Sequence, residues 1–182
     1  MTNVLIVAAS KHGATTEIAC SIGQQLELRG IHTMVTDPGE LPSKLDYDAF
    51  VVGGAVYAGA WSPAARRFVE AQRDLLASRP LWLFSSGPVG DIASGPDQPR
   101  QVTAFADELH ARDHRVFGGR LEPTALHLYE RLAVRFVHAP YGDFRDWHDI
   151  EQWADSIATA LGHPAHARPP VPPRGVAENA LA

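Results

Sequence analysis

The sequence of 182 residues contains one cysteine, Cys20, and no long apolar run. A single cysteine excludes an internal disulfide and any zinc or iron–sulfur site built on several cysteines of one chain. No apolar stretch approaches the ~18 residues that a membrane-spanning helix needs. No basic segment followed by an apolar run opens the chain, as it would in a secretory signal peptide. We therefore expect a cytoplasmic protein, and we predict that Cys20 is a small buried residue within a helix.

The sequence also lacks an excess of positive charge. Its formal net charge is -5 and its pI is about 6.0. Proteins that bind nucleic acid draw most of their affinity from a basic face, so nucleic acid is not an expected partner. The shares of hydrophobic residues, 45%, and of charged residues, 20%, are ordinary for a globular protein, and the length fits one domain with a full core.

Three common site motifs are absent. The dinucleotide pattern G-x-G-x-x-G, the nucleotide pattern G-x-x-x-x-G-K-[ST] and the zinc pattern H-E-x-x-H do not occur. Among the nine histidines, His163 and His166 fall in a stretch of tail-like composition. His110 and His114 are predicted to lie near the end of a helix, where a solvated or dipole-compensating role is expected. We predict no metal site.

The chain does contain an alternation of short apolar runs and segments of helical periodicity, which is typical of a βαβ protein with a parallel sheet. Ile18, Ile22 and Leu26 follow one another at intervals of four on the first helix. The predicted strands are Val4–Ala8, Ile31–Thr36, Ala49–Gly54, Leu81–Phe84 and Arg115–Leu121. The predicted helices run from Ala14 to Gly30, from Pro63 to about Ser78, from Gln98 to Ala111 and from Asp146 to Leu161.

Two segments stand outside this alternation. Residues 122–145 form an insertion before the last helix, and their middle, Leu126–Val137, has helical apolar spacing. From His163 the composition turns to Pro, Ala, His and Arg, which cannot bury enough surface to fold. We therefore predict one domain over residues 1–162 and a disordered tail over residues 163–182.

Five strands joined by helices indicate an α/β protein with a doubly wound parallel sheet and helices on both faces. In such sheets, ligands bind beyond the carboxyl ends of the strands, where the strand order reverses. The loops after the first, third and fourth strands are therefore the expected place of chemistry.

The loop after the first strand is rich in small and hydroxylated residues: Ser10, Lys11, His12, Gly13, Ala14 and Thr15. Such a loop offers backbone N–H groups and hydroxyls to an anion, and the helix that follows adds its positive end. A phosphate monoester fits this set of donors. The alternative interpretation is a plain strand-to-helix turn capped by threonine.

This loop resembles the flavodoxin phosphate loop, [ST]-x-T-G-x-T, with Ser10, Gly13 and Thr15 at matching places and His12 where the family usually has threonine. The resemblance covers roughly residues 3–161. It implies the strand order 2-1-3-4-5 and non-covalent binding of flavin mononucleotide (FMN). It also assigns cofactor contacts to two further loops, Val56, Tyr57, Ala58 and Gly59 after the third strand, and Ser85, Ser86, Gly87, Pro88, Val89 and Gly90 after the fourth.

Two aromatic residues near these loops are candidates for stacking on the flavin ring. Tyr57 is the favoured stacking residue, and Trp61 is more simply interpreted as core. The loop after the fourth strand has no aromatic residue, which would leave one face of the ring open to a substrate.

Within the flavodoxins, the sequence is most similar to the menaquinone-dependent protoporphyrinogen dehydrogenases. The similarity lies in Val116–Leu121, in Asp146 and Trp147, and in the placement of an insertion between them. The resemblance implies an FMN oxidoreductase that passes electrons or hydride to a small molecule or a quinone. The alternatives are a one-electron carrier without its own substrate and a binding module that has lost the cofactor. No residue is identified as catalytic.

The helical part of the insertion, residues 126–137, has two interpretations. Its apolar residues and its two arginines, Arg131 and Arg135, are compatible with peripheral docking to the inner face of a membrane or to a quinone. The favoured interpretation is that the same face covers the core of the domain or a second copy in a homodimer.

Overall fold

The computed structural model describes residues 1–57, 59–87, 100–121 and 142–163. Its main sheet has five parallel strands in the order β2-β1-β3-β5-β6, which is the predicted order 2-1-3-4-5 in terms of the five principal strands. These strands are β1 (Asn3–Ala9), β2 (His32–Thr36), β3 (Ala49–Tyr57), β5 (Leu81–Ser86) and β6 (Asp113–Phe117). The doubly wound α/β class is therefore confirmed.

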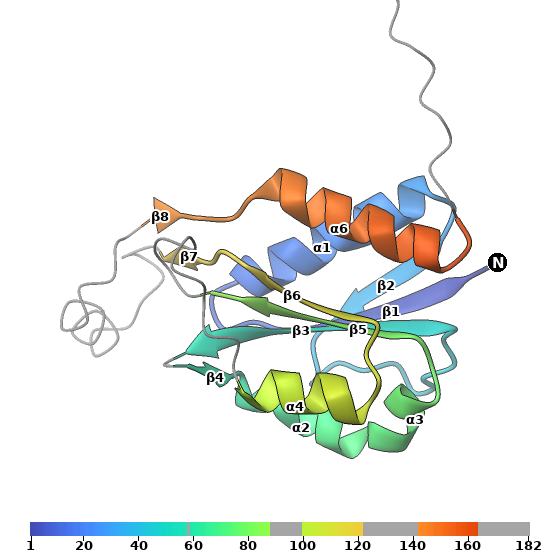
Figure 1. Ribbon diagram of the computed structural model, residues 1–182, viewed down its shortest axis with the longest axis horizontal. Helices are drawn as coiled ribbons and strands as arrows, with labels where there is room; N and C mark the ends of the chain where they lie inside the picture. The colour runs from blue at the N-terminus through green and yellow to red at the C-terminus, as the bar shows by residue number, and fades with distance from the viewer. Residues whose placement is uncertain (58, 88–99, 122–141, 164–182) are drawn as a thin grey trace, which may run out of the picture.

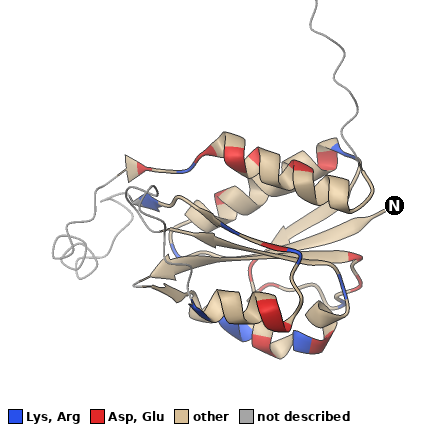
Figure 2. Ribbon diagram, in the orientation of Figure 1, with Lys and Arg blue, Asp and Glu red and all other residues tan. Residues whose placement is uncertain are grey.

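Helices cover both faces of the sheet (Figure 1). On one face lie α1 (Ala14–Leu28) and α6 (Trp147–Ala160). On the other lie α2 (Pro63–Ala71), α3 (Arg73–Ala77) and α4 (Arg100–Glu108). Each face buries its own apolar cluster, because successive side chains of a strand point to opposite faces. Figure 2 shows β1, β3 and β5 without charged residues and most charges on helices and loops, as expected for strands buried on both faces.

The helix α1 illustrates how the sequence pattern produces the layer. Ile18, Ile22 and Leu26 are all fully buried on the face that meets the sheet. At its end the amide of Gly30 donates to the carbonyl of Glu27 at 2.9 Å, and Gly30 has a φ of 77°, the left-handed conformation that favours glycine. The predicted C-terminal glycine is therefore confirmed.

Several predicted boundaries are wrong. The predicted helix from Pro63 to Ser78 is divided at Gln72, whose backbone (φ -109°, ψ 20°) leaves the helical region. The predicted strand Arg115–Leu121 is two strands, because the chain leaves the sheet after Phe117 and residues 120–121 form β7 (Arg120–Leu121). This short strand pairs antiparallel with β8 (Gly142–Asp143), and β4 (Ala60–Trp61) pairs antiparallel with β3.

Three further predictions about single residues are corrected. Cys20 is exposed, because it falls on the side of α1 that faces away from the sheet. His114 lies in β6 and does not end a helix. His163, assigned to the tail, is part of the fold, since its ring contacts the Thr2 hydroxyl at 3.0 Å and the Arg29 carbonyl at 3.1 Å.

Some predictions fall on residues that the structure does not describe. They are the docking or dimer segment 126–137, the tail beyond His163, and the cofactor contacts at Ala58, Pro88, Val89 and Gly90. Within the described residues, no helix is long and apolar enough to cross a membrane.

Candidate functional site

The carboxyl ends of β1, β3 and β5 lie side by side at one edge of the sheet. The register pairs Ala9 with Gly54 and Gly54 with Ser85, so the three loops that follow these strands start next to one another. In Figure 1 this edge also carries β4, β7 and β8. The strand order reverses between β1 and β3, so the edge is the switch point at which doubly wound sheets bind their ligands.

The loop after β1 ends in a turn that leaves backbone donors available. Gly13 is the N-cap of α1, with a φ of 85° and no side chain to cap the helix. The first intrahelical hydrogen bond runs from the Glu17 amide to the Gly13 carbonyl, at 2.9 Å. The amides of Ala14, Thr15 and Thr16 precede that bond and need partners from outside the helix. Such a turn, at the positive end of a 15-residue helix, suits an anion.

The hydroxyls of this loop have different environments. Ser10 is half-buried, and Lys11 is exposed. Thr15 is 1% exposed, and its Oγ1 lies 2.6 Å from the Oγ of Ser86 at the end of β5. A hydroxyl has one donor and two acceptor positions, so Thr15 retains hydrogen-bonding capacity beyond Ser86. The structure thus joins the first and third predicted contact loops through two buried hydroxyls.

The two serines that end β5 face opposite sides of the sheet. Ser86 points toward α1, whereas Ser85 is fully buried on the other face, where its Oγ lies 3.1 Å from Nε2 of His114. Burial lowers the pKa of His114, and the charge of Asp113 raises it in part. The Ser85 side chain is therefore held in the core and does not line the edge with its neighbour, which sequence position alone did not reveal.

The carboxyl ends of β3 and β5 lie close together at this edge. A Cβ built on Gly87, which has a φ of 95°, would lie 3.3 Å from the carbonyl oxygen of Val56. Tyr57 is 45% exposed, as a stacking residue must be. Trp61 is 1% exposed and its Nε1 donates to the Gly54 carbonyl at 3.0 Å, so Trp61 is core.

An ion-pair cluster that the sequence did not reveal lies beside the turn at Gly13. Glu17, in the first turn of α1, accepts hydrogen bonds from Arg120 at 2.8 Å and from Arg145 at 2.7 Å. Arg145 also donates to Asp143, and its hydrogen bonds lower the pKa of both carboxyls, Glu17 and Asp143. These partners are more than 100 residues from Glu17 in sequence, a separation that no local pattern encodes.

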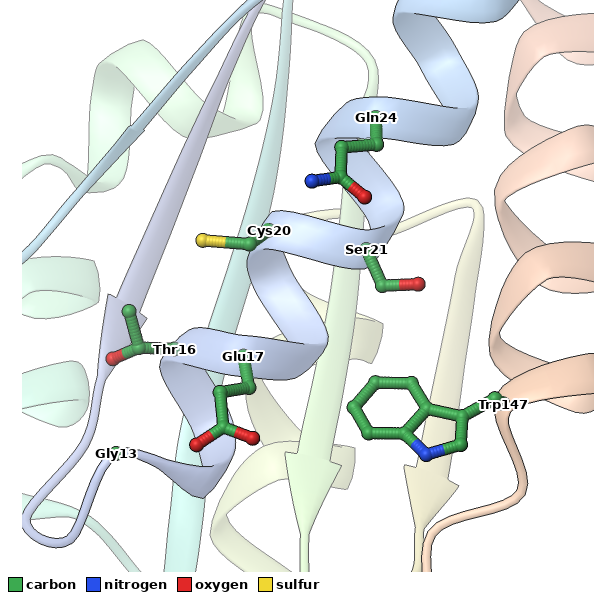
Figure 3. A pocket seen from close by; sticks show the side chains of 7 residues that line it. All are labelled: Gly13, Thr16, Glu17, Cys20, Ser21, Gln24 and Trp147. Carbon is green, nitrogen blue, oxygen red and sulfur yellow. The ribbon is translucent and has the colours of Figure 1, made fainter.

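An open cavity of about 570 Å³ lies between α1 and the start of α6. Figure 3 shows the Trp147 ring on one side of it, near Glu17 and Ser21, while Cys20 and Thr16 project from the other side of α1. The cavity shares only Gly13 with the predicted cofactor contacts. The predicted anion site, the uncapped turn, therefore meets this cavity only at Gly13.

The chain matches the family model of the flavodoxin domain over residues 5–147 and therefore belongs to the flavodoxin family. Members of this family bind FMN. No curated protein matches the chain in sequence.

Solved structures support the fold. A flavodoxin from the domain Archaea has 16% identity and a TM-score of 0.59, with 89% of this chain and 100% of the other covered. The flavodoxin of Streptococcus pneumonia TIGR4 has 19% identity and a TM-score of 0.58, with 87% and 99% covered. The rubredoxin oxygen:oxidoreductase of Desulfovibrio gigas has 13% identity and a TM-score of 0.61, with 89% of this chain but 36% of that enzyme covered.

The arrangement fits FMN on two observations. The turn at Gly13 presents several amides with no side-chain cap, as a phosphate ester requires. The end of β3 lies close to Gly87, which follows β5, and Tyr57 at the end of β3 is an exposed aromatic residue, as a flat heterocycle requires. Within the described residues, no group of histidine, cysteine and carboxylate side chains is arranged to hold a metal ion.

Proposed function

We propose that this chain is an FMN-dependent oxidoreductase that passes electrons or hydride to a small-molecule acceptor of the quinone class. The observation that carries the proposal is the uncapped, glycine-headed first turn of α1 at the sheet edge where β1, β3 and β5 end together. Electron transfer through FMN is the general activity of the flavodoxin domain.

The residues of the three loops have distinct parts in this proposal. The amides at the start of α1, with the hydroxyls of Ser10 and Thr15, hold the phosphate. Tyr57 stacks on the flavin ring, and the backbone of the Gly87 loop lies along its edge. When bound, FMN supplies the hydride and one-electron chemistry, and the protein binds, orients and tunes it. No side-chain acid or base is assigned.

Two features favour a substrate-transforming enzyme. The loop that follows β5 contains no aromatic residue from Ser85 to Asp91, so this loop supplies no stacking ring and leaves one face of the flavin open. Val116–Leu121 and the Asp146–Trp147 pair resemble the menaquinone-dependent protoporphyrinogen dehydrogenases. An open face is what a second substrate needs for direct reaction with the ring.

A second candidate is a one-electron carrier without its own substrate. It is favoured by the chain's nearly complete coverage of small flavodoxins, 100% of the archaeal protein and 99% of the streptococcal one. The two candidates differ in what the reduced protein does with a quinone.

The experiment starts with an absorption spectrum of the purified protein and a fluorescence titration with FMN. The loaded protein is then reduced without oxygen and mixed with menaquinone and other quinones. Rapid two-electron reoxidation supports the oxidoreductase. Reduction in two separated one-electron steps, with no reaction toward quinones, supports the carrier.

A matched pair of glycine variants tests the placement of the phosphate. Gly13 and Gly30 have similar left-handed backbones, with φ of 85° and 77°, and a Cβ would have room at both. Alanine is therefore expected to cause a similar backbone strain of about 1 kcal/mol at either place. Gly13→Ala should weaken FMN binding and Gly30→Ala should not. Equal affinities in the two variants would mean that the phosphate lies elsewhere.

A further inference from the structure

Four charged side chains form a network beside the turn that begins α1. Arg120 donates to both carboxylate oxygens of Glu17, at 2.8 and 3.2 Å, and Arg145 donates a third hydrogen bond to Glu17 at 2.7 Å. Arg145 also grips both oxygens of Asp143, at 2.8 Å from Nε and 2.6 Å from Nη2. Among the described residues, the network joins two positive and two negative side chains.

Burial makes Arg145 the centre of this network. Its side chain is 2% exposed, whereas those of Arg120, Glu17 and Asp143 are 24%, 43% and 42% exposed. A buried guanidinium needs carboxylate partners to offset its lost hydration. The ring of Trp147 lies over one face of the Arg145 guanidinium, with 4.4 Å between Cζ and the ring centroid. Arg145 is thus held in one orientation, with one of its N–H groups directed at Glu17.

The network fixes the β7–β8 ribbon onto the first turn of α1. Arg120 and Asp143 are register partners in the ribbon, and the amide of Phe144 donates to the carbonyl of Gly119 at 3.0 Å. Both arginines then reach across to Glu17. Residues far apart in sequence are therefore joined at the helix end that we assign to the phosphate.

Glu17 lies close enough to that turn to oppose an anion. A Cβ built on Gly13 would be 3.7 Å from Oε1 of Glu17, which is van der Waals contact. A carboxylate at this distance repels a phosphate dianion unless its charge is balanced, because like charges at close range interact strongly near a protein surface. Three N–H donors from the two arginines supply that balance.

We propose that Arg145 and Arg120 are positioning residues for the flavin phosphate, acting through Glu17. By neutralising and orienting this carboxylate, they allow the first turn of α1 to accept a dianionic ester. The inference rests on the proposed FMN function. If the network only secured the ribbon, the variants described next would give different results from those that we expect.

The experiment measures the affinities of FMN and riboflavin, which lacks the phosphate, by quenching of flavin fluorescence. Arg145→Gln should weaken FMN binding about 10- to 100-fold, because it removes one of the two guanidinium groups that balance the Glu17 carboxylate beside the phosphate. Riboflavin affinity should stay within about twofold, since riboflavin carries no phosphate charge to repel. The double variant Glu17→Gln with Arg145→Gln should regain FMN affinity to within about threefold of wild type, since the repelling charge is gone.

Two controls accompany these variants. Arg73→Gln removes the same charge from an ion pair with Glu108 on the opposite face of the sheet, and should leave both affinities unchanged. Should the Arg145 variants fail to fold, Arg120→Gln and its double with Glu17→Gln carry the same comparison. Arg120 is more exposed and shares the same carboxylate.

Three outcomes would overturn the inference. If the double variant bound FMN as weakly as the single variant, the Glu17 carboxylate would not be the group that repels the phosphate. The effect would not concern the phosphate if riboflavin lost as much affinity as FMN. An Arg145 variant with wild-type FMN affinity would remove the role of the arginine while leaving the FMN site intact. Wild-type protein that binds neither flavin would instead overturn the proposed function itself, and this inference with it.

Discussion

Replacing Thr15 by valine tests the buried hydroxyl pair that connects the turn at α1 to the end of β5. Thr15 and Ser86 are 1% and 4% exposed, and their oxygens lie 2.6 Å apart. Valine keeps the branched shape of threonine but leaves the Ser86 hydroxyl buried without this partner. A buried polar group left unsatisfied costs about 1–3 kcal/mol, so we expect Thr15→Val to lower the free energy of unfolding by that amount.

The measurement is urea denaturation of the FMN-free protein, with the midpoint shifted and the slope unchanged. Thr16→Val is the matched control, because Thr16 is exposed on the same turn and its change should stay within about 0.5 kcal/mol. The double variant Thr15→Val with Ser86→Ala should be less destabilised than the two single changes added together, since both polar groups are removed. A Thr15→Val protein as stable as the Thr16→Val control would refute the reasoning.

The same variants separate two roles of the Thr15 hydroxyl. If it also reaches the phosphate, Thr15→Val loses about 1–3 kcal/mol of FMN binding, the usual range for a charge-assisted hydrogen bond. Ser86→Ala leaves that hydroxyl in place and should lose less. Equal FMN affinities in the two variants would confine Thr15 to a structural role.

Three further predictions follow from single residues. Tyr57→Ser should weaken FMN binding by about 1–3 kcal/mol, the range of aromatic stacking on a base. The urea midpoint of the FMN-free variant, measured in parallel, separates a loss of binding from a loss of stability, and an unchanged affinity would exclude Tyr57 as the stacking residue. Gly53→Ala should destabilise the protein by about 1–3 kcal/mol through overpacking, because the new Cβ would lie 2.0–2.5 Å from atoms of the Phe84 ring. In urea denaturation, adding Phe84→Leu to this variant should recover part of the lost stability. No recovery would contradict the steric overlap. Burial lowers the pKa of His114, so the unfolded chain binds more protons than the folded one, and the free energy of unfolding should fall as the pH drops below about 6.5, the ordinary pKa of histidine. Urea midpoints at several pH values should show a weaker pH dependence of stability in His114→Gln than in wild type or in a variant of the exposed His148. The same pH dependence in all three proteins would refute this reasoning.

Local signals explain which parts of the fold were predictable. The apolar runs of β1, β3 and β5 and the four-residue spacing on α1 are set by neighbours in sequence, and they gave the strands, the helices and the layers. The strand order came from the resemblance to the flavodoxins and not from this periodicity. The boundary at Gln72 had no such signal, because residues 63–78 contain neither glycine nor an internal proline at that point. The end of the fifth parallel strand was missed because Gly118 and Gly119 were included in one strand, whereas the chain leaves the sheet at this pair of glycines and then forms β7.

The candidate site divides in the same way. The glycine and hydroxyls of the loop after β1 indicate an anion site without any structure, since the chemistry resides in consecutive residues. The sequence did not show which of the two serine hydroxyls points toward α1, because Ser85 and Ser86 differ only in the face of β5 on which they fall. The sequence did not reveal the partners of Glu17 either, because Arg120 lies in β7 and Arg145 follows β8, and these two strands pair only in the folded chain.

The sequence by itself therefore determined the fold class and the family, since both rest on local periodicity and on one contiguous loop. Only the tertiary structure decided the electrostatics of the proposed phosphate site. Charge balance at Glu17 depends on Arg120 and Arg145, which lie 103 and 128 residues away along the chain. Pairing over such distances is set by how the layers pack, and no spacing in the sequence encodes it.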